Sequence, residues 1–429
     1  MRDMKDSGIE WVGKIPDEWS VAHLKYACSF KTGGTPNNKK GIENEGDYMW
    51  VTPPDITDSY TILQTKQWIS NEAIKNSGYT LFPKQSVLLV CIASVGKVGI
   101  INKKAYSNQQ ITALKPKCEI MFPKYLLYSI AAGSKQISFD ASSNVIPIVN
   151  TKYLEGFSIT FPQIEEQVQI ADFLDTKCAD IDALSTDIQS EIDTLEAYKR
   201  AVITEAVTKG LDRNVPMKDS GIPWIGIVPA HWSIYRIADL YEDRNERGNE
   251  SLPLLSVSIN SGVSDKELSD DEQERVFIRS EDKSKYKRVY PGDITYNMMR
   301  AWQGAFGAVR VDGMVSPAYV VAKQKRITDI DSRFIEALIR SPMGIEEMNR
   351  FSYGIMDFRK RLYWPQFRIM KVCLPDINEQ RMIADYIDLR SVEIDSVITK
   401  KQEQLALLAE YKKSLIYEYV TGKKEVPAS

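Results

Sequence analysis

The chain has 429 residues, of which 43% are hydrophobic and 26% charged, a globular composition long enough for two or three domains. The longest apolar run, 87–93, is too short for a membrane helix, and two histidines exclude a His-rich zinc site. The net charge of −3 divides into +4 over 1–160, −8 over 161–212, +3 over 213–373 and −2 over 374–429. Only the two mildly basic blocks suit contact with phosphate.

The start of the chain, Met1–Asp6, is polar and charged, so no secretory signal is visible. The five cysteines are scattered and never form a CxxC pair, which fits reduced thiols. We therefore expect a cytoplasmic protein with no membrane partner.

The chain contains an internal repeat. Residues 5–24 and 218–237 are identical at 10 of 20 positions, with a shift of 213 and the shared pattern G-I-x-W-x-G-x-x-P-x-x-W-S. A second block, 161–210, returns as 374–423 at the same shift, with 19 of 50 positions identical. Two blocks with one common shift indicate a duplicated framework.

Between these blocks, residues 25–160 and 238–373 diverge and share only a loose skeleton of glycines and prolines. Each contains β-rich stretches, such as 86–92 and 315–322, and short helical stretches, such as 125–132 and 333–339. We predict a compact mixed α/β domain in each. A fixed framework with two different inserts suits the recognition of two different things.

The second block predicts long helices, because 164–208 contains no proline or glycine. Apolar residues recur at spacings of three, four and seven, which is typical of a helical seam. The seam residues are Leu174, Ile181, Leu184, Ile188, Ile192, Leu195, Tyr198 and Val202, and then Ile387, Ile394, Val397, Leu405, Leu408, Tyr411 and Leu415. Each helix of ~45 residues would span ~68 Å and needs a partner along its length. We expect the two to pack as an antiparallel coiled coil; the alternative is two separate helices, each covering its own domain.

The predicted fold class is therefore α+β, with two mixed α/β recognition domains separated by two long helices in a pseudo-two-fold repeat. The predicted domains are 1–160 and 213–373, and the helical regions are 161–212 and 374–429.

Catalytic motifs are missing. An adenine methyltransferase needs an N-P-P-[YF] or D-P-P-[YF] turn, whereas the nearest string, 52–55, reads Thr-Pro-Pro-Asp. No G-x-x-x-x-G-K-[ST] loop for a nucleotide-driven motor is present. We expect no catalytic residue, no metal site and no cofactor bound by this chain.

The repeated opening, the repeated P-x-x-x-E-Q-x-x-I-A-D entry into each long helix, and the strings at 32–36, 107–110 and 296–304 form an ordered set. Together they resemble the specificity subunit of type I restriction–modification systems over essentially the whole chain. The resemblance implies a non-catalytic subunit that binds double-stranded DNA, two methylation subunits and restriction subunits. S-adenosylmethionine, ATP and Mg²⁺ would then be bound by those partners.

Residue type selects candidate DNA contacts, because Asn and Gln can bond adenine, Arg can bond guanine, and Lys can meet phosphate. In the first domain the candidates are Lys31, Gly33, Gly34, Lys39, Lys40, Lys97, Asn108, Gln109 and Gln110. In the second they are Asn297, Arg300, Gln303, Arg359, Lys360 and Arg361. The two glycines would let the backbone approach DNA closely.

Other interpretations remain open on the sequence. The partner could instead be a single chain that fuses methylase and nuclease, which this sequence hardly distinguishes. A self-contained methyltransferase or nuclease conflicts with the missing cofactor motifs. A coiled-coil scaffold whose modules bind protein or carbohydrate is the third alternative.

Overall fold

The computed structural model describes residues 2–34, 42–75, 79–141, 146–249, 251–267, 285–326, 329–354 and 360–427. The chain forms two compact units, the first made of 1–190 and 401–429 and the second of 191–400. Each unit therefore combines one recognition domain with part of both long helices. Among the described residues, no helix has the length and apolar character needed to cross a bilayer.

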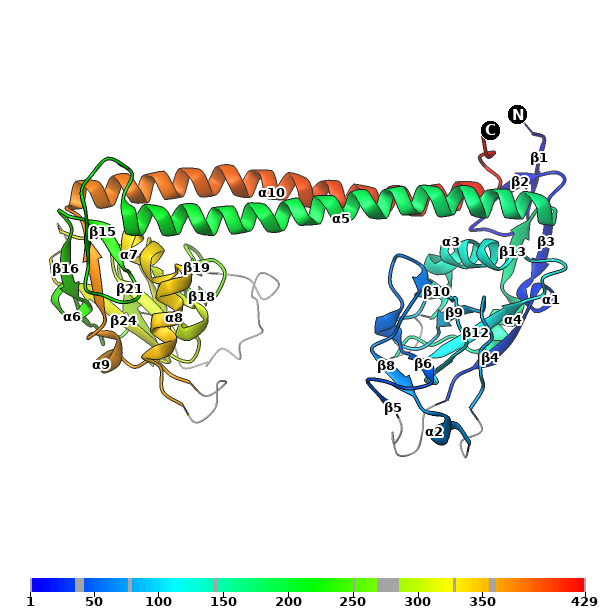
Figure 1. The fold of residues 1–429 in the computed structure, drawn as a ribbon, viewed down its shortest axis with the longest axis horizontal. Helices are drawn as coiled ribbons and strands as arrows, with labels where there is room; N and C mark the ends of the chain where they lie inside the picture. Colours follow the sequence, from blue (N-terminus) through cyan, green and yellow to red (C-terminus); the bar gives the residue numbers. More distant parts are fainter. Residues whose placement is uncertain are drawn as a thin grey trace. The chain divides into compact units, whose positions relative to one another are not determined.

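The first unit contains two sheets, ordered β4-β12-β9-β10-β7 and β11-β6-β8-β5, and two antiparallel strand pairs, β1-β2 and β3-β13 (Figure 1). Its strands are β1 Met4–Asp6, β2 Lys14–Pro16, β3 Ser20–His23, β4 Cys28–Thr32, β5 Ile42–Glu43, β6 Tyr48–Val51, β7 Thr61–Ile62, β8 Gln67–Ile69, β9 Val87–Val90, β10 Val98–Ile101, β11 Ala105–Ser107, β12 Ile111–Pro116 and β13 Ser158–Phe161. Its shorter helices are α1 Leu24–Ala27, α2 Asn71–Lys75, α3 Pro123–Ala141 and α4 Thr151–Gly156. Buried residues of α3 share one core with Trp19 and with the two long helices.

The second unit is built around the antiparallel sheet β17-β24-β21-β22. Its strands are β14 Met217–Asp219, β15 Ile227–Pro229, β16 Ser233–Arg236, β17 Tyr241–Asp243, β18 Val257–Ser258, β19 Gly262–Val263, β20 Lys287–Val289, β21 Ile294–Asn297, β22 Phe306–Ala308, β23 Gly313–Val315, β24 Tyr319–Gln324 and β25 Lys371–Leu374. Its shorter helices are α6 Ile237–Leu240, α7 Ser332–Ile339, α8 Pro342–Arg350 and α9 Trp364–Phe367. The predicted mixture of helix and strand is confirmed in both domains.

The two long helices are α5, Ile164–Lys209, and α10, Ile377–Val420. Each is followed within two residues by a glycine in the left-handed region, Gly210 at φ 72° and Gly422 at φ 69°. A residue with a Cβ is strained there, so these glycines fit a helix C-terminus. At the start of α10, the Asp376 carboxylate accepts backbone N–H bonds from Asn378 and Glu379.

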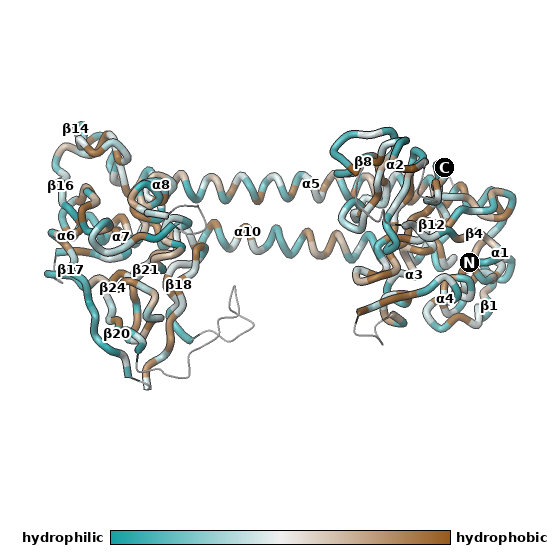
Figure 2. The backbone as a smooth tube through the Cα atoms, turned by 90° about the horizontal axis from the view of Figure 1, so that it is seen from below, coloured by the Kyte–Doolittle hydropathy of each residue, from teal (hydrophilic) through white to brown (hydrophobic). Residues whose placement is uncertain are grey.

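Within each unit the helices pack antiparallel. In the first, Lys412 Nζ donates to Asp182 at 2.6 Å; in the second, Lys199 Nζ donates to Asp395 at 2.7 Å. The internal repeat relates these two ion pairs, because Asp182 and Lys199 become Asp395 and Lys412 at the shift of 213. The predicted antiparallel packing is confirmed, and Figure 2 shows hydrophilic and hydrophobic residues alternating along both helices.

Part of the predicted seam is wrong. Ile181, Ile188, Ile192 and Ile394 are buried as expected. However, four seam residues are exposed: Leu184 (48%), Tyr198 (48%), Val397 (42%) and Tyr411 (55%). The recognition domains bury additional positions of the helices, such as Ala171 and Ile416, so the buried face is wider than a two-helix seam and turned away from these residues.

The glutamine of the repeated E-Q pair explains why that motif recurs. Gln167 is 1% exposed; its Nε2 donates to the carbonyls of Ile120 and Pro162, and its Oε1 accepts the N–H of Phe122. In the second unit Gln380 accepts the N–H of Asp331 in the same way. One side chain thus joins the helix start to the domain by three hydrogen bonds.

We expect Gln167→Leu to destabilise the first unit by about 2–4 kcal/mol, because it removes three hydrogen bonds to backbone groups, one of them buried and two partly buried. Denaturant titration followed by circular dichroism measures this loss. Gln169→Leu is the matched control, since Gln169 is exposed on the same helix. Equal unfolding midpoints for the two variants would contradict the assignment.

Candidate nucleic-acid interface

In the first unit, loops from distant parts of the chain meet at one end of the five-stranded sheet, where β4 and β9 end and where β10 and β12 begin. We call this end of the sheet its polar edge. The strand register pairs Thr32 with Thr112, Val90 with Ile111, and Leu89 with Val98. Segments 33–34, 91–97 and 107–110 therefore all begin or end at this edge. They are joined by backbone bonds, from Gly34 N to Ser107 O at 3.0 Å and from Cys91 N to Gln110 O at 2.7 Å.

The glycines of this edge are required by the protein's own packing. A Cβ on Gly33 would lie 2.2 Å from Ser107 Oγ and 2.3 Å from Asn108 O, so no side chain fits. A Cβ on Gly34 would lie 3.3 Å from the ring of Tyr79. The close backbone approach predicted at these positions is thus made by the chain itself, and their contact with DNA stays a prediction.

The amide cluster of this edge is partly engaged in internal bonds. Asn108 Nδ2 donates to Gln110 Oε1 at 2.9 Å, and Asn108 Oδ1 accepts the Gln110 N–H at 3.1 Å. Gln109 is exposed between them. The bonds between Asn108 and Gln110 hold the turn.

Two lysines are available at this edge. Lys31 on β4 and Lys97 before β10 are both exposed, and within the described part of the chain neither ammonium makes a hydrogen bond or ion pair. Lys39 and Lys40 lie outside the described residues.

In the second unit, the equivalent edge lies where β21 ends. Asn297 pairs with Tyr319 of β24, and residues 298–305 connect β21 to β22. The 360–362 segment joins this loop through a bond from Leu362 N to Met298 O at 2.8 Å. The structure therefore brings five of the six candidates of this domain together, and Arg359 lies outside the described residues.

These five side chains divide into two groups. Asn297 is 4% exposed and its Oδ1 accepts the N–H of Met299, while Lys360 bonds Asn349 Oδ1 and lies 5.8 Å from the centre of the Trp302 ring. By contrast, Arg300, Gln303 and Arg361 make no side-chain hydrogen bond or ion pair among the described residues. The second group has donors free for a ligand, and Asn297 serves as a turn cap.

The chemistry of these edges suits nucleic acid. A free guanidinium can bond the O6 and N7 of guanine in a fork, an amide can bond adenine, and an exposed ammonium can meet any phosphate. Among the described residues, no three His, Cys, Asp or Glu side chains are grouped to hold a metal ion.

Comparison with known proteins also points to DNA recognition. Residues 16–194 match the family model described as "Type I restriction modification DNA specificity domain". The MjaVIII specificity subunit of Methanocaldococcus jannaschii is 24% identical over 96% of this chain and 94% of its own length. The EcoBI specificity subunit of Escherichia coli is 21% identical over 98% of this chain and 90% of its own.

Over almost its whole length the chain is similar to type I restriction–modification specificity subunits, and its residues 16–194 match their family model. A solved structure described as "Structural basis underlying complex assembly and conformational transition of the type I R-M system" contains a chain with the same fold. Its TM-score is 0.68 at 12% identity, covering 96% of this chain and 99% of that one.

The fold also brings together one basic cluster that the sequence analysis did not select. The Tyr290 ring lies between the guanidinium groups of Arg244 and Arg288, at 4.5 and 4.6 Å from its centre. Lys287 Nζ donates to Tyr319 O at 2.8 Å, so the cluster adjoins the edge that carries Asn297. Burial lowers the pKa of Lys287. Burial also raises the pKa of Asp293, and the ion pair with Arg244 opposes that rise.

A signal for this cluster was present in the sequence. The string Lys-Tyr-Lys-Arg at 285–288 has three cations in four residues. Arg244, however, is 44 residues away from Arg288, and only the strand pairing brings the two to one ring.

Proposed function

We propose that each unit reads one half of an asymmetric, two-part DNA target through the edge described above. One observation carries this proposal: the repeat builds an equivalent edge in both units and furnishes it with different polar side chains. The first edge offers lysines and amides, and the second offers two arginines and a glutamine. Two different edges call for two different half-sites.

Within the edges we assign roles by residue type. Arg300, Gln303 and Arg361 would contact base edges in one half-site, and the amides Asn108, Gln109 and Gln110 would contact adenine in the other. Lys31 and Lys97 would neutralise phosphates, with Lys39, Lys40, Arg359 and Lys360 as further cations.

We also propose that the chain itself is not catalytic and holds two methylation subunits, joined by restriction subunits. The support is a pair of repeat-equivalent apolar patches. Tyr411 and Leu184 are exposed in the first unit, and Tyr198 and Val397 in the second. The ion-pair register places the two members of each patch across the helix pair from one another. Two like patches suit two copies of one partner. S-adenosylmethionine, ATP and Mg²⁺ would bind those partners.

The test compares Arg300→Ala with Lys97→Ala in the complex with methylation subunits. Arg300→Ala should cost about 1–3 kcal/mol of binding to the cognate target and relax one base position. Lys97→Ala should weaken binding to all sequences alike and lower the salt slope by about one, because every phosphate is identical. Titrations at several salt concentrations, with each base of the target varied, measure both effects.

Lys103→Ala is the matched control. Lys103 is exposed and follows β10, so it leaves the sheet at the edge opposite to Lys97. A change in salt slope for Lys103→Ala equal to that for Lys97→Ala would contradict the assigned edge.

A further inference from the structure

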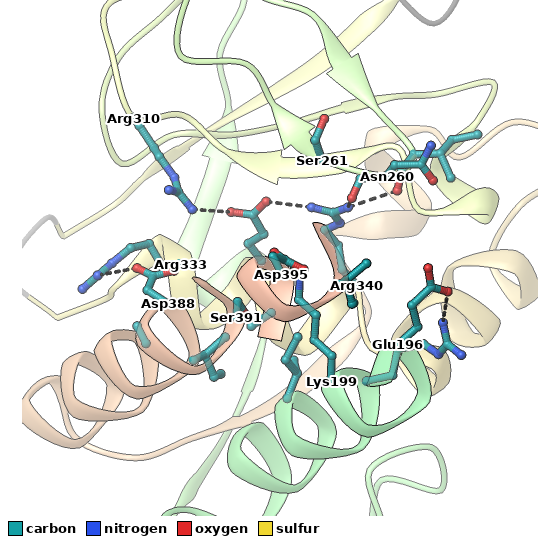
Figure 3. Close-up of a pocket in the computed structure, with 18 residues that line it drawn as sticks. Glu196, Lys199, Asn260, Ser261, Arg310, Arg333, Arg340, Asp388, Ser391 and Asp395 are labelled. Atoms are coloured by element: carbon teal, nitrogen blue, oxygen red, sulfur yellow. Dashed lines mark hydrogen bonds and ion pairs between the residues drawn. The ribbon is translucent and has the colours of Figure 1, made fainter. Parts of the chain in front are cut away.

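The second unit contains a cleft of about 770 Å³ between its recognition domain and the helix pair. Figure 3 shows Ser261 and Arg310 on the domain side, and Lys199, Ser391 and Asp395 on the helices below them. The apolar residues that line it are Ile203, Ile259, Ile387, Ile398, Ala337 and Ala384. Nothing in the assigned DNA-reading edge uses this cleft.

The first unit allows a residue-by-residue comparison around this place. Phe122 and Asp331 donate to the repeat-equivalent glutamines Gln167 and Gln380. Lys124 and Arg333 pair with the equivalent carboxylates Asp175 and Asp388. Tyr125 and Phe334 each meet the repeated tryptophan edge to face. Helices α3 and α7 therefore align at a shift of 209, which places Ala337 where the first unit has Tyr128.

A second substitution lies on the opposite wall. Tyr60 immediately precedes β7, which lies beside Gly99 of β10. Ser261 immediately precedes β19, and Val263 of that strand lies beside Gly307 of β22. Gly99 and Gly307 correspond in the two halves, so Ser261 stands where the first unit has Tyr60.

In the first unit these two tyrosines fill the space. The Tyr60 and Tyr128 rings meet edge to face with centres 6.1 Å apart, and Lys412 Nζ lies 4.9 Å from the Tyr60 ring centre. The same ammonium donates to Asp58 O at 2.6 Å and to Asp182. Lys412 is consequently only 6% exposed.

In the second unit the equivalent lysine and carboxylate, Lys199 and Asp395, are present, but the two tyrosine rings are not. Lys199 Nζ donates to both oxygens of Asp395, at 2.8 and 2.7 Å. Among the described residues it has no ring beside it and no carbonyl in the place of Asp58 O. Its side chain is 28% exposed.

Charges have replaced apolar groups nearby. At the 209 shift, Glu336 stands for Leu127 and Arg340 for Ala131; Glu336 is bonded to Arg340 at 3.2 Å and faces Arg310 at 3.9 Å. Gly262 makes room for this carboxylate, since a Cβ there would lie 2.4 Å from Glu336 Oε1. A buried ion pair is seldom more stable than a well-packed apolar cluster, and the first unit shows that the apolar solution fits this framework. Stability alone therefore does not account for the open, charged cleft.

We propose that the cleft receives an aromatic side chain from a loop of one methylation subunit, as Tyr60 fills the first unit. The ring would lie on Ala337 and Ser261 beside Lys199, and a carbonyl of the same loop would accept the bond that Asp58 O accepts from Lys412. Arg310 is 54% exposed and only 3.9 Å from Glu336, so its guanidinium would also meet an acidic neighbour of that ring. This inference rests on the proposed methylation partner and adds that its two copies dock differently.

The experiment fills the cleft from within, by Ala337→Tyr, the residue that the first unit carries. Native mass spectrometry then follows a titration with the purified methylation subunit of the same system. We expect the wild-type chain to bind two copies, and the variant to bind one copy normally and the other at least tenfold more weakly. Ala337→Ser, which keeps the cleft open, should behave as wild type.

Ser391→Phe fills the same cleft from the helix wall and gives a second reading should Ala337→Tyr not fold. Two copies bound with unchanged affinity by a folded filling variant overturn the inference while leaving the proposed partner intact. A wild-type chain that binds no methylation subunit overturns the proposed partner, and the inference with it.

Discussion

Exchanging the first recognition domain for that of a relative with a different target should replace one half of the methylated motif and leave the other half unchanged. The physical reason is that the polar edge at 33–34, 91–97 and 107–110 belongs entirely to this domain. The second edge belongs to another unit with its own core. Replacing one edge therefore changes one set of base contacts.

The structure also sets where such an exchange should be cut. The sequence boundaries were 25 and 160, yet β13 pairs with β3, Thr160 with Val21. Thr160 also bonds Val420 O in α10. An exchange of 25–157 keeps this strand pair and the helix contact in the recipient, so we expect it to fold where a cut inside β13 would leave mismatched partners.

Single-molecule sequencing of N6-methyladenine in a host expressing the variant with its partners reads the motif directly. The matched control is the exchange of 238–370, which keeps β16 paired with β25 and should change the other half only. An unchanged motif after either exchange, with methylation intact, would falsify the hypothesis that each recognition domain specifies its own half-site.

The two long helices could be predicted from the sequence because helix formation depends on the residues of each segment itself. Absence of proline and glycine predicted α5 and α10, and the glycines after them end both helices at positive φ. Four of the fifteen predicted seam residues are exposed, because helical spacing identifies an apolar face but not what covers it. Leu184 and Tyr198 satisfy the spacing and are exposed, since the domains contact the neighbouring face.

The sequence predicted which loops come together at the two polar edges, but not which of their side chains are buried or paired. Residue type selected Asn297 for adenine, yet the fold buries it as a turn cap. It did not select Arg244, because the Tyr290 stack joins segments distant in sequence. The cleft could not be predicted from the sequence for a similar reason. The residues of α3 and α7 correspond at a shift of 209, whereas the framework repeats at a shift of 213.

Shortening both long helices in register should shorten the spacer between the half-sites while preserving the half-sites themselves. The two ion pairs fix the register, since Asp182 faces Lys412 and Lys199 faces Asp395. Removing 187–193 together with 401–407 takes seven residues from each helix between these pairs and keeps both in place. Seven residues are nearly two turns, so the faces stay aligned.

The expected size follows from helix geometry. Seven residues at 1.5 Å each shorten a helix by ~10 Å, which is ~3 base pairs of duplex at 3.4 Å per pair. Because neither polar edge contains a deleted residue, the base contacts are untouched. Motif sequencing of the methylated genome measures the spacer.

Deletion from one helix only is the control. Removing 187–193 alone shifts α5 against α10 by two turns, so Lys199 can no longer face Asp395 while Asp182 faces Lys412. This variant should lose folding or modification altogether. If the helices set the distance between the half-sites, only the paired deletion should give a shorter spacer. Altered half-sites with an unchanged spacer would show that the helices do not set the distance, and that the domains select their spacing through the DNA edges instead.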